Sequence, residues 1–530
     1  MPVIAGVIEQ DEWRWVLVAS SLLIIAISIP FVWAYAAAVP GHCFGGFLVN
    51  PVDGHSYLAK MYQGYSGGWL YTLPYTPEPH QGVMLFSFYL APGHLARLLS
   101  LPLILDFHTA RLKGSLLMLL SLYVFVSDWT DDVTQRRITW GLAAVGSGFG
   151  VFALMAGRAT PTPDLNMPEG FLLYAAYANA HFPWAISALI WVAHTLTRVI
   201  LVERDLQPML HIHSLVLTAA TLLLMSISPF GLAPLGIGVG ALLALLWRGQ
   251  KQFPLREFEW SLVPLIFGLP LFAYNIWAIS GANPAFQAWM RQNLTPSPPV
   301  WDYLIAYGLL LALGAVGILR GCRTLDGGDA LLLAWLIGGA VLLYAPIGLQ
   351  RRFTMGLILP LSIYAGRGVW RVLVPLVGRR LRPILISVIF LLAAPTTVLV
   401  ITLPMAGVAA RDGRLYVTDE ETALLDWVTD NTPGDSLVLA SPDYSLYLPA
   451  RGRRVVYGHP FETLHAEERE REVISFYAGV DCSVVPNEGV DYVVVGPREH
   501  ALGQGEKECP IPGELAVRFG DVELYVVGEE

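Results

Sequence analysis

The side chains best suited to acid–base chemistry gather in two loops rich in glycine and proline. The first loop, residues 50–82, contains Asp53, Glu78 and His80. A carboxylate placed there can take a proton from a hydroxyl group, or it can hold a divalent metal ion together with other acids. The structural alternative is that Asp53 is the N-cap of a short helix. The presence of Glu78 and His80 in the same loop favours a functional site.

The second loop, residues 158–185, has the same polar character. If the two loops converge on one cleft, we expect its polar side chains to bind substrate. The alternatives are a solvated or helix-capping role for the acids and an interfacial position for the histidine. The residues concerned are Asp164, Glu169, Asn179 and His181.

A pair of arginines forms the third candidate site. Arg351 and Arg352 follow Gln350 in a short polar turn between two apolar runs. Guanidinium groups match phosphate oxygens in bidentate geometry, so the phosphate of a lipid is a natural ligand. The alternative is ordinary binding of lipid headgroups.

The elements that must position these residues are membrane spans. Hydrophobic residues make up 55% of the chain and charged residues only 14%, with a mean hydropathy of +0.53, whereas about a quarter of a soluble protein is charged. Eleven apolar runs are long enough to cross a bilayer. The runs are 15–37, 106–126, 138–156, 181–202, 209–227, 230–247, 261–280, 303–320, 329–347, 353–370 and 383–403.

Lysine and arginine in the short loops predict the orientation, because cytoplasmic loops carry the excess of both. With eleven spans all the basic loops fall on one side, so the N-terminus is expected in the cytoplasm. Residues 38–105, 157–180, 281–302, the turn at 348–352 and the C-terminal region are then extracytoplasmic. The basic residues that decide this are Arg136, Arg137, Arg198, Arg204, Arg248, Lys251, Arg256, Arg320, Arg323, Arg371, Arg379, Arg380 and Arg382.

A twelfth apolar segment, residues 83–100, is interrupted by Pro92-Gly93. If it crossed the membrane, every later loop would change sides and the positive-inside bias would invert. We therefore interpret it as a re-entrant or interfacial helix.

The chain changes character after the membrane domain, residues 1–404, and residues 405–530 form a small α/β domain in this interpretation. Residues 406–530 hold 10 Lys and Arg but 24 Asp and Glu, a balance that argues against a nucleic-acid partner. Thr418 and Glu421 have capping-box spacing, and a charged helix is expected at 464–477. Strands are expected at 437–440, 455–457 and 492–495, and a hairpin at 515–519 and 522–527.

Two features of this C-terminal domain stay open. Cys482 and Cys509 form a disulfide if the domain faces an oxidising compartment, and are otherwise two free thiols. His459 and Glu462 lie close together in sequence, and capping of their own loop is the simplest role for them.

The loop sequences resemble those of the GT-C superfamily of membrane glycosyltransferases, which includes protein O-mannosyltransferases and aminoarabinose transferases. The resemblance is to bacterial members, over most of the chain but with loose motifs. It is carried by D-G-H-S-Y-L-A-K-M-Y-Q-G-Y at 53–65, W-L-Y-T-L-P-Y-T-P-E-P at 69–79 and Y-A-N-A-H-F-P at 177–183. It implies a mainly α, GT-C-like bundle of about eleven spans, carrying the α/β domain, in the inner membrane.

The resemblance also implies a function. Such an enzyme is an inverting hexosyltransferase that moves a sugar from a polyprenyl-phosphate carrier to an acceptor, here unidentified, at the outer face of the bilayer. Asp53 would be the general base, Glu78 and His80 would shape the sugar site, and Arg351 and Arg352 would hold the carrier phosphate. Many members carry two adjacent acids in the first loop, whereas Gly54 follows Asp53 here. A requirement for Mg²⁺ or Mn²⁺ therefore stays open, and no cofactor is certain.

Two other classes of function remain. A transporter or flippase for a lipid-linked substrate needs its polar residues near the bilayer midplane. A non-catalytic scaffold needs no polar site at all. The candidate residues all lie in loops predicted to be external, which favours the enzyme.

Overall fold

The structure is a computed structural model that describes residues 7–203, 205–208, 211–281, 283–321, 326–503 and 509–528. The basic loop residues Arg204 and Arg323, and also Cys322, lie outside the described residues. The chain divides into two compact units. Unit 1 comprises residues 1–28, 110–273 and 295–403, and unit 2 comprises residues 29–109, 274–294 and 404–530.

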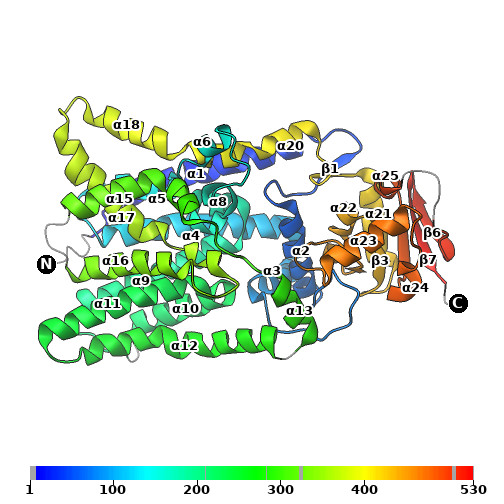
Figure 1. Cartoon of the computed structure of the whole chain (residues 1–530), viewed down its shortest axis with the longest axis horizontal. Coiled ribbons are helices and arrows are strands. Elements are labelled where there is room, and N and C mark those ends of the chain that lie inside the picture. The colour runs from blue at the N-terminus through cyan, green and yellow to red at the C-terminus, as the bar shows by residue number, and fades with distance from the viewer. Residues whose placement is uncertain are drawn as a thin grey trace. The chain divides into compact units, whose positions relative to one another are not determined.

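Helices account for every one of the apolar runs identified in the sequence (Figure 1). Within the described residues, seven helical segments are long and apolar enough to cross a membrane, or nine if each of two bent pairs is one span. Two further apolar helices, Ile212–Ile227 and Gly327–Leu342, are shorter than these spans, so the predicted number of eleven spans stays a prediction. The bundle helices are α1 (Gln10–Ala36), α4 (Leu103–Ser127), α5 (Val133–Val145), α6 (Gly150–Met155), α9 (His181–Leu201), α10 (Ile212–Ile227), α11 (Leu232–Gln250), α12 (Leu255–Ser280), α14 (Val300–Ala306), α15 (Gly308–Gly321), α16 (Gly327–Leu342), α17 (Ile358–Arg367), η4 (Gly368–Leu373), η5 (Val374–Leu376), α18 (Arg382–Ala393) and α19 (Pro395–Thr402).

Two predicted runs are each a bent pair of helices rather than one straight span. Helices α14 and α15 meet at 83°, and the pair that begins at α18 and continues at α19 bends by 47°. Pro395 opens α19, and its ring cannot continue the hydrogen-bond ladder of the preceding helix. The bend at 394–395 therefore follows from local sequence.

Small residues bring helices of unit 1 into backbone contact. A Cβ atom added to Gly317 of α15 would overlap the carbonyl oxygen of Tyr364 in α17, and one added to Gly368 would overlap the carbonyl oxygen of Leu313. Close approach at glycine is the usual way in which helices pack inside a bilayer, where dispersion replaces the hydrophobic effect.

Short elements of unit 1 carry the second candidate loop and the arginine turn. They are α7 (Pro163–Asn166), η1 (Pro168–Gly170), α8 (Leu172–Ala178), η2 (Pro229–Gly231) and η3 (Gln350–Thr354).

In unit 2 the segment 38–105, which the sequence predicts to be external and which is called the first external segment below, contains a helical hairpin of α2 (Pro51–Tyr65) and α3 (Ser87–Leu99). Helix α3 corresponds to the interrupted apolar segment, and its 13 residues span only about 20 Å at 1.5 Å per residue. That is less than the ~30 Å of a hydrocarbon core, in keeping with a re-entrant or interfacial helix. Gly64 and Gly93 permit the contact, because a Cβ on either would overlap the backbone of the other helix.

The C-terminal part of unit 2 contains a five-stranded sheet in the order β4-β3-β5-β7-β6; its strands β3, β6 and β7 are labelled in Figure 1. Strand β3 pairs in parallel with β4 and β5, whereas β7 pairs antiparallel with β5 and β6. The strands are β3 (Leu437–Leu439), β4 (Arg454–Val455), β5 (Tyr492–Val495), β6 (Gly513–Phe519) and β7 (Val522–Val527). The predicted strands and hairpin are confirmed, with small shifts at their ends.

Helices cover both faces of this sheet, as the alternation of side chains requires. Val438 and Val494 share a core with α21 (Asp419–Asn431) on one face. Leu439 and Val493 share the other core with α23 (Ala466–Tyr477). The remaining elements of unit 2 are α13 (Pro284–Gln292), α20 (Pro404–Ala410), α22 (Pro442–Ser445), η6 (Leu448–Arg451), α24 (Val484–Glu488) and α25 (Pro497–Leu502).

The first external segment and the C-terminal sheet belong to the same folded body. Ala59 of α2 and Tyr75 are members of the core that includes Leu424 of α21. Strand β1 (His42–Phe44) pairs antiparallel with β2 (Tyr416–Thr418). The predicted capping box of α21 is present, with Thr418 Oγ1 accepting from the Glu421 amide at 3.1 Å and Glu421 Oε2 accepting from the Thr418 amide at 2.9 Å.

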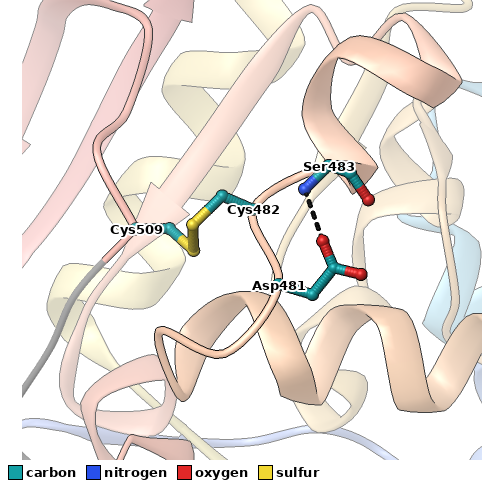
Figure 2. The surroundings of a disulfide bond; sticks show 4 residues. All are labelled: Asp481, Cys482, Ser483 and Cys509. Atoms are coloured by element: carbon teal, nitrogen blue, oxygen red, sulfur yellow. Dashed lines mark hydrogen bonds between the residues drawn. A yellow bond between two sulfur atoms is a disulfide. The ribbon is translucent and has the colours of Figure 1, made fainter.

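Cys482 and Cys509 form a disulfide, which decides between the two alternatives for these residues (Figure 2). Their Cα atoms are 5.4 Å apart and the bond closes a chain segment of 27 residues. Cys482 precedes α24, where the backbone turns on a hydrogen bond of 2.9 Å from the Ser483 amide to Asp481 Oδ1. A stable disulfide is typical of an oxidising compartment, in agreement with the predicted extracytoplasmic location.

Replacing both Cys482 and Cys509 by Ser is expected to lower the stability of unit 2 by about 3.5 kcal/mol, because a cross-link over 27 residues restricts the unfolded chain by that amount. Thermal unfolding of the full chain in detergent measures the loss. Cys43→Ser is the matched control, since Cys43 is an exposed cysteine outside the disulfide. Equal unfolding temperatures for all three proteins would contradict this expectation.

Candidate functional site

Asp53 lies in the first turn of α2 and is not its N-cap. The N-cap is Asn50, whose side chain accepts from the Asp53 amide, and Pro51 occupies the first helical position. The helix is therefore capped three residues before Asp53, and the alternative in which Asp53 is the N-cap is wrong. Asn50 instead orients the acid, because its Nδ2 donates to Asp53 Oδ2 at 2.6 Å. The Asp53 side chain is 37% exposed, so its carboxylate is accessible.

The second partner of Asp53 comes from the C-terminal part of unit 2. His459 Nε2 lies 3.2 Å from Asp53 Oδ1, and the histidine side chain is only 2% exposed. On its other edge, His459 Nδ1 accepts from the amides of Phe461 and Glu462 at 3.1 and 3.2 Å. The loop-capping role expected for His459 is present, and the contact with Asp53 is an addition that the sequence did not reveal.

A buried ion pair lies in the same region of unit 2. Lys60 Nζ is 2.5 Å from Glu462 Oε1, with the two side chains 1% and 10% exposed. Ser56 donates to the same carboxylate oxygen at 2.5 Å and Tyr71 donates to the other at 2.8 Å. Burial raises the pKa of Glu462, but the charge of Lys60 and the hydrogen bonds from Lys60 and Ser56 outweigh it and lower the pKa to about 2. Glu462 is therefore a structural anion.

The loop that carries His459 and Glu462 is tied down along its length. Thr463 Oγ1 accepts from the His459 amide at 3.2 Å. Gln292, at the end of α13, donates to the Thr463 carbonyl at 2.6 Å, and Asn293 donates to the Phe461 carbonyl at 2.6 Å. Because these bonds come from two separate parts of unit 2, the position of the imidazole is fixed by tertiary structure.

Glu78 and His80 hold the first loop in place. His80 Nε2 accepts from the Leu73 amide and its Nδ1 donates to the Glu78 carbonyl, both at 2.8 Å. Glu78 Oε1 pairs with Arg469 at 2.9 Å. Burial raises the pKa of Glu78, but hydrogen bonds from Thr76 and Arg469 lower it overall. Both ring nitrogens of His80 bond to backbone, and Glu78 is engaged in an ion pair. A substrate-binding role for the two residues stays a prediction.

Asp164, in unit 1, is a structural residue. Its side chain is buried, and its Oδ2 accepts from the amides of Gly148 and Gly150 at 3.2 and 3.0 Å. Thr162 donates to Oδ1 at 2.5 Å. A Cβ at Gly150 would overlap the carboxylate, so Asp164 fastens the second loop to the start of α6. Both oxygens of Asp164 are thus bonded within unit 1, and a substrate-binding role for this residue stays a prediction.

Glu169 and the two arginines come together in unit 1, a contact that the sequence analysis did not predict. Glu169 Oε1 lies 3.9 Å from Arg351 Nε and 3.7 Å from Arg352 Nη1. The carboxylate is buried, whereas the two arginine side chains are 32% and 34% exposed. Neither Glu169 Oε1 nor Arg351 Nε has a hydrogen-bond partner among the described residues. Glu169 therefore lies at ion-pair distance from two partly exposed guanidinium groups, an arrangement suited to an anion.

The turn that carries these arginines is rigid. Gln350 donates to the Ala345 carbonyl at 2.7 Å and accepts from the Ser297 amide at 3.0 Å. The Arg351 amide donates to the Thr295 carbonyl at 3.1 Å. The turn is thus bonded to residues 295–297 and also to Ala345.

Asn179 and His181 flank the junction between α8 and α9. Asn179 is half-buried at the end of α8, and the His181 ring packs on Phe182 with centroids 4.1 Å apart. Arg111 of α4 donates to the Ala176 carbonyl at 3.1 Å, where a cation complements the C-terminal end of α8. A substrate-binding role for Asn179 and His181 stays a prediction.

Several residues of the site escaped the sequence analysis. Ser56 and Lys60 are one helical turn apart on α2, a spacing visible in the sequence, but nothing there pairs them with Glu462. Within the described part of the chain, no group of three or more His, Cys, Asp and Glu side chains is arranged to hold a metal ion. The partners of Asp53 are an amide and an imidazole, and Glu462 is bonded to Lys60, so the surroundings of Asp53 do not form a divalent-cation site.

Comparison with known protein families and with curated proteins finds no match for this chain. Comparison with solved structures finds similar folds. The oligosaccharyltransferase AglB from Archaeoglobus fulgidus, in complex with an inhibitory peptide and a dolichol-phosphate, aligns with a TM-score of 0.54 over 92% of this chain and 70% of its own, at 14% identity. A second AglB structure, tethered to an acceptor peptide, gives a TM-score of 0.56 over 92% and 69% at 14% identity.

Two further structures extend the comparison. The arabinofuranosyltransferase AftD from Mycobacteria aligns with a TM-score of 0.52 at 15% identity, covering 100% of this chain and 41% of its own. ArnT from Cupriavidus metallidurans, bound to undecaprenyl phosphate, aligns with a TM-score of 0.50 at 13% identity, over 98% of this chain and 100% of its own. At these identities the likeness is one of fold.

Proposed function

We propose that this chain, which has the fold of the GT-C membrane glycosyltransferases, transfers a sugar from a polyprenyl-phosphate carrier to an acceptor hydroxyl on the extracytoplasmic face of the inner membrane. AglB and ArnT were solved with dolichol-phosphate and undecaprenyl phosphate, which supports a donor of this class. The observation that carries the proposal is Asp53, an accessible carboxylate in the first external segment with one hydrogen-bond donor on each oxygen.

Asp53 acts as the general base in this proposal. As the acceptor oxygen attacks the anomeric carbon, its proton passes to the carboxylate of Asp53. The bond between the anomeric carbon and the carrier phosphate breaks, and its electron pair leaves with the phosphate. One displacement at the anomeric carbon inverts its configuration. The orientation of the carboxylate by Asn50 and His459 supports this role, because a base must lie within hydrogen-bonding reach of the proton that it takes.

Arg351 and Arg352 bind the carrier phosphate and stabilise the charge that develops on it as the sugar leaves. Their placement beside the buried Glu169 supports this role, because the carboxylate holds the guanidinium groups while their outer donors remain available. The proposal derives no step through a metal ion, since the residues around Asp53 do not fit one.

Replacing Arg352 by Gln is expected to raise the KM for the lipid-linked donor about 10- to 100-fold, which is the loss of one charge-assisted hydrogen bond to phosphate. Initial rates over a series of donor concentrations measure the change. Arg248→Gln is the control. Arg248 is an exposed arginine in the last turn of α11, so its substitution removes the same charge. If the donor KM of Arg352→Gln were unchanged, the carrier phosphate would not bind at this turn.

The function is tested with a panel of radiolabelled polyprenyl-phosphate sugars. Purified protein in liposomes is mixed with each donor and with delipidated material from native membranes as the source of acceptor. Transfer of label from lipid to a non-lipid product is the expected result. If label stays on the lipid and instead changes leaflet, the chain is a transporter of lipid-linked sugar, and the proposed function is wrong.

A further inference from the structure

The two nitrogens of His459 have different partners, and this fixes the position of the ring proton. Nδ1 faces the backbone amides of Phe461 and Glu462 at 3.1 and 3.2 Å. An amide can only donate, so Nδ1 must present its lone pair. The proton of the imidazole is therefore on Nε2, the atom that lies 3.2 Å from Asp53 Oδ1. The histidine donates and the carboxylate accepts.

This donor completes a symmetrical arrangement around Asp53. Asn50 donates to Oδ2 and His459 donates to Oδ1. Each carboxylate oxygen accepts about two hydrogen bonds, so each keeps one lone pair for the proton of an acceptor. The two donors also define the plane of the carboxylate.

The surroundings of His459 make it suited to positioning another group. Its side chain is 2% exposed, and its loop is anchored through Thr463, Gln292 and Asn293. The titratable groups that face the pair are Tyr75, whose ring centroid is 5.6 Å from that of His459, and the Glu462–Lys60 ion pair. Glu462 and Lys60 have opposite charges, so the field of one offsets that of the other at Asp53.

We propose that His459 is the positioning residue of the catalytic base, through which the C-terminal part of the chain orients Asp53 and keeps it ready to accept a proton. The proposal rests on the function given above for Asp53. It assigns to the region 404–530 a direct share in the chemistry, beyond covering the site or binding an acceptor.

Two substitutions separate positioning from loop capping. In His459→Asn the amide oxygen replaces Nδ1 as acceptor for the loop amides, and the donor to Asp53 is lost. In His459→Gln the amide nitrogen reaches the place of Nε2, and the loop cap is lost. The probe is the water-soluble carbodiimide EDC with glycine methyl ester, which modifies protonated carboxyl groups. Its yield at Asp53 is measured in the full chain by peptide mass spectrometry as a function of pH.

The expected result is that His459→Asn moves the midpoint of Asp53 labelling about one pH unit upward, because one charge-assisted hydrogen bond is lost. The midpoint of His459→Gln is expected to stay close to that of wild type. The acid limb of the transfer rate moves in the same direction. An unmoved midpoint in His459→Asn, or equal shifts in both variants, would overturn the proposal and leave His459 as a loop cap only.

A measurement on the unmutated ring keeps the proposal falsifiable if His459→Asn does not fold. The imidazole nitrogens are labelled with ¹⁵N, and the His459 signals are assigned by their absence in His459→Gln. A protonated Nε2 and an unprotonated Nδ1 are expected, and the opposite tautomer overturns the proposal. Failure of the proposed function gives a different result. Asp53→Asn would then transfer sugar as fast as wild type, whatever the His459 variants show.

Discussion

Replacing Asp53 by Asn is expected to lower the rate of sugar transfer about 10²- to 10⁴-fold, the usual contribution of a general base. Asn is close to Asp in size and still accepts through one oxygen, so α2 and its contacts with Asn50 are expected to persist. Binding of the lipid-linked donor does not need the carboxylate, so the loss should appear in kcat with little change in the donor KM. Initial-rate kinetics in liposomes separate the two.

The matched control for this variant is Asp430→Asn. Asp430 is an exposed acid of α21 in the same unit of the structure, and its substitution removes the same charge without touching the site. We expect wild-type transfer from it. If Asp53→Asn kept more than a tenth of the activity, another group would have to be the base.

The second large effect is on stability. Replacing Lys60 by Met is expected to destabilise the protein by about 3–5 kcal/mol, because the substitution leaves Glu462 buried without its cation. Met keeps most of the volume of the lysine chain and its contact with the ring of Phe86, which lies 4.7 Å from Lys60 Nζ. The loss is therefore electrostatic in origin. Thermal unfolding of the full chain in detergent measures it.

The double variant Lys60→Met with Glu462→Gln tests that origin. With no charge left to bury, most of the lost stability should return, since neutral replacement of a buried ion pair is often close to neutral in free energy. If the double variant were as unstable as Lys60→Met, the loss would come from packing around α2 and the ion pair would not be its cause.

The pH dependence of stability follows from the carboxylate of Glu462. The pKa of Glu462 falls from its ordinary value of 4.5 to about 2 in the folded protein, so ionised Glu462 favours the folded state. Its contribution is fully present above pH 4.5 and is lost as the pH falls towards 2. In Lys60→Met the isolated carboxyl takes up a proton more readily, so the difference in stability from wild type should shrink below pH 4.5. Unfolding measured at pH 7 and at pH 3.5 shows the sign.

Much of the fold could be predicted because the information is local. The apolar runs are long, and length alone separates membrane helices from core helices. The capping box at Thr418 and Glu421 involves residues three apart, and the hairpin around Gly520 joins neighbouring strands. The alternative in which Asp53 is the N-cap had a local signal against it, since Asn50-Pro51 is the stronger start of a helix, with Pro at the first helical position.

The candidate site was predictable only in part. A carboxylate early in the first loop and the pair of arginines beside Glu169 were found from residue type and expected location. The hydrogen bonds that Asp164 and His80 make to the backbone could not be predicted, because the sequence does not distinguish a polar side chain that binds backbone from one that binds substrate. Only the contacts distinguish the two.

The sequence by itself determined that this is a chain of membrane helices with a mixed α/β region at its end, and it pointed to Asp53. Tertiary structure alone decided what orients that acid. The contact between Asp53 and His459 joins residues 406 positions apart, and that between Lys60 and Glu462 joins residues 402 positions apart. No periodicity encodes such distances, because they arise only when the first external segment and the C-terminal sheet bury their apolar faces in one core.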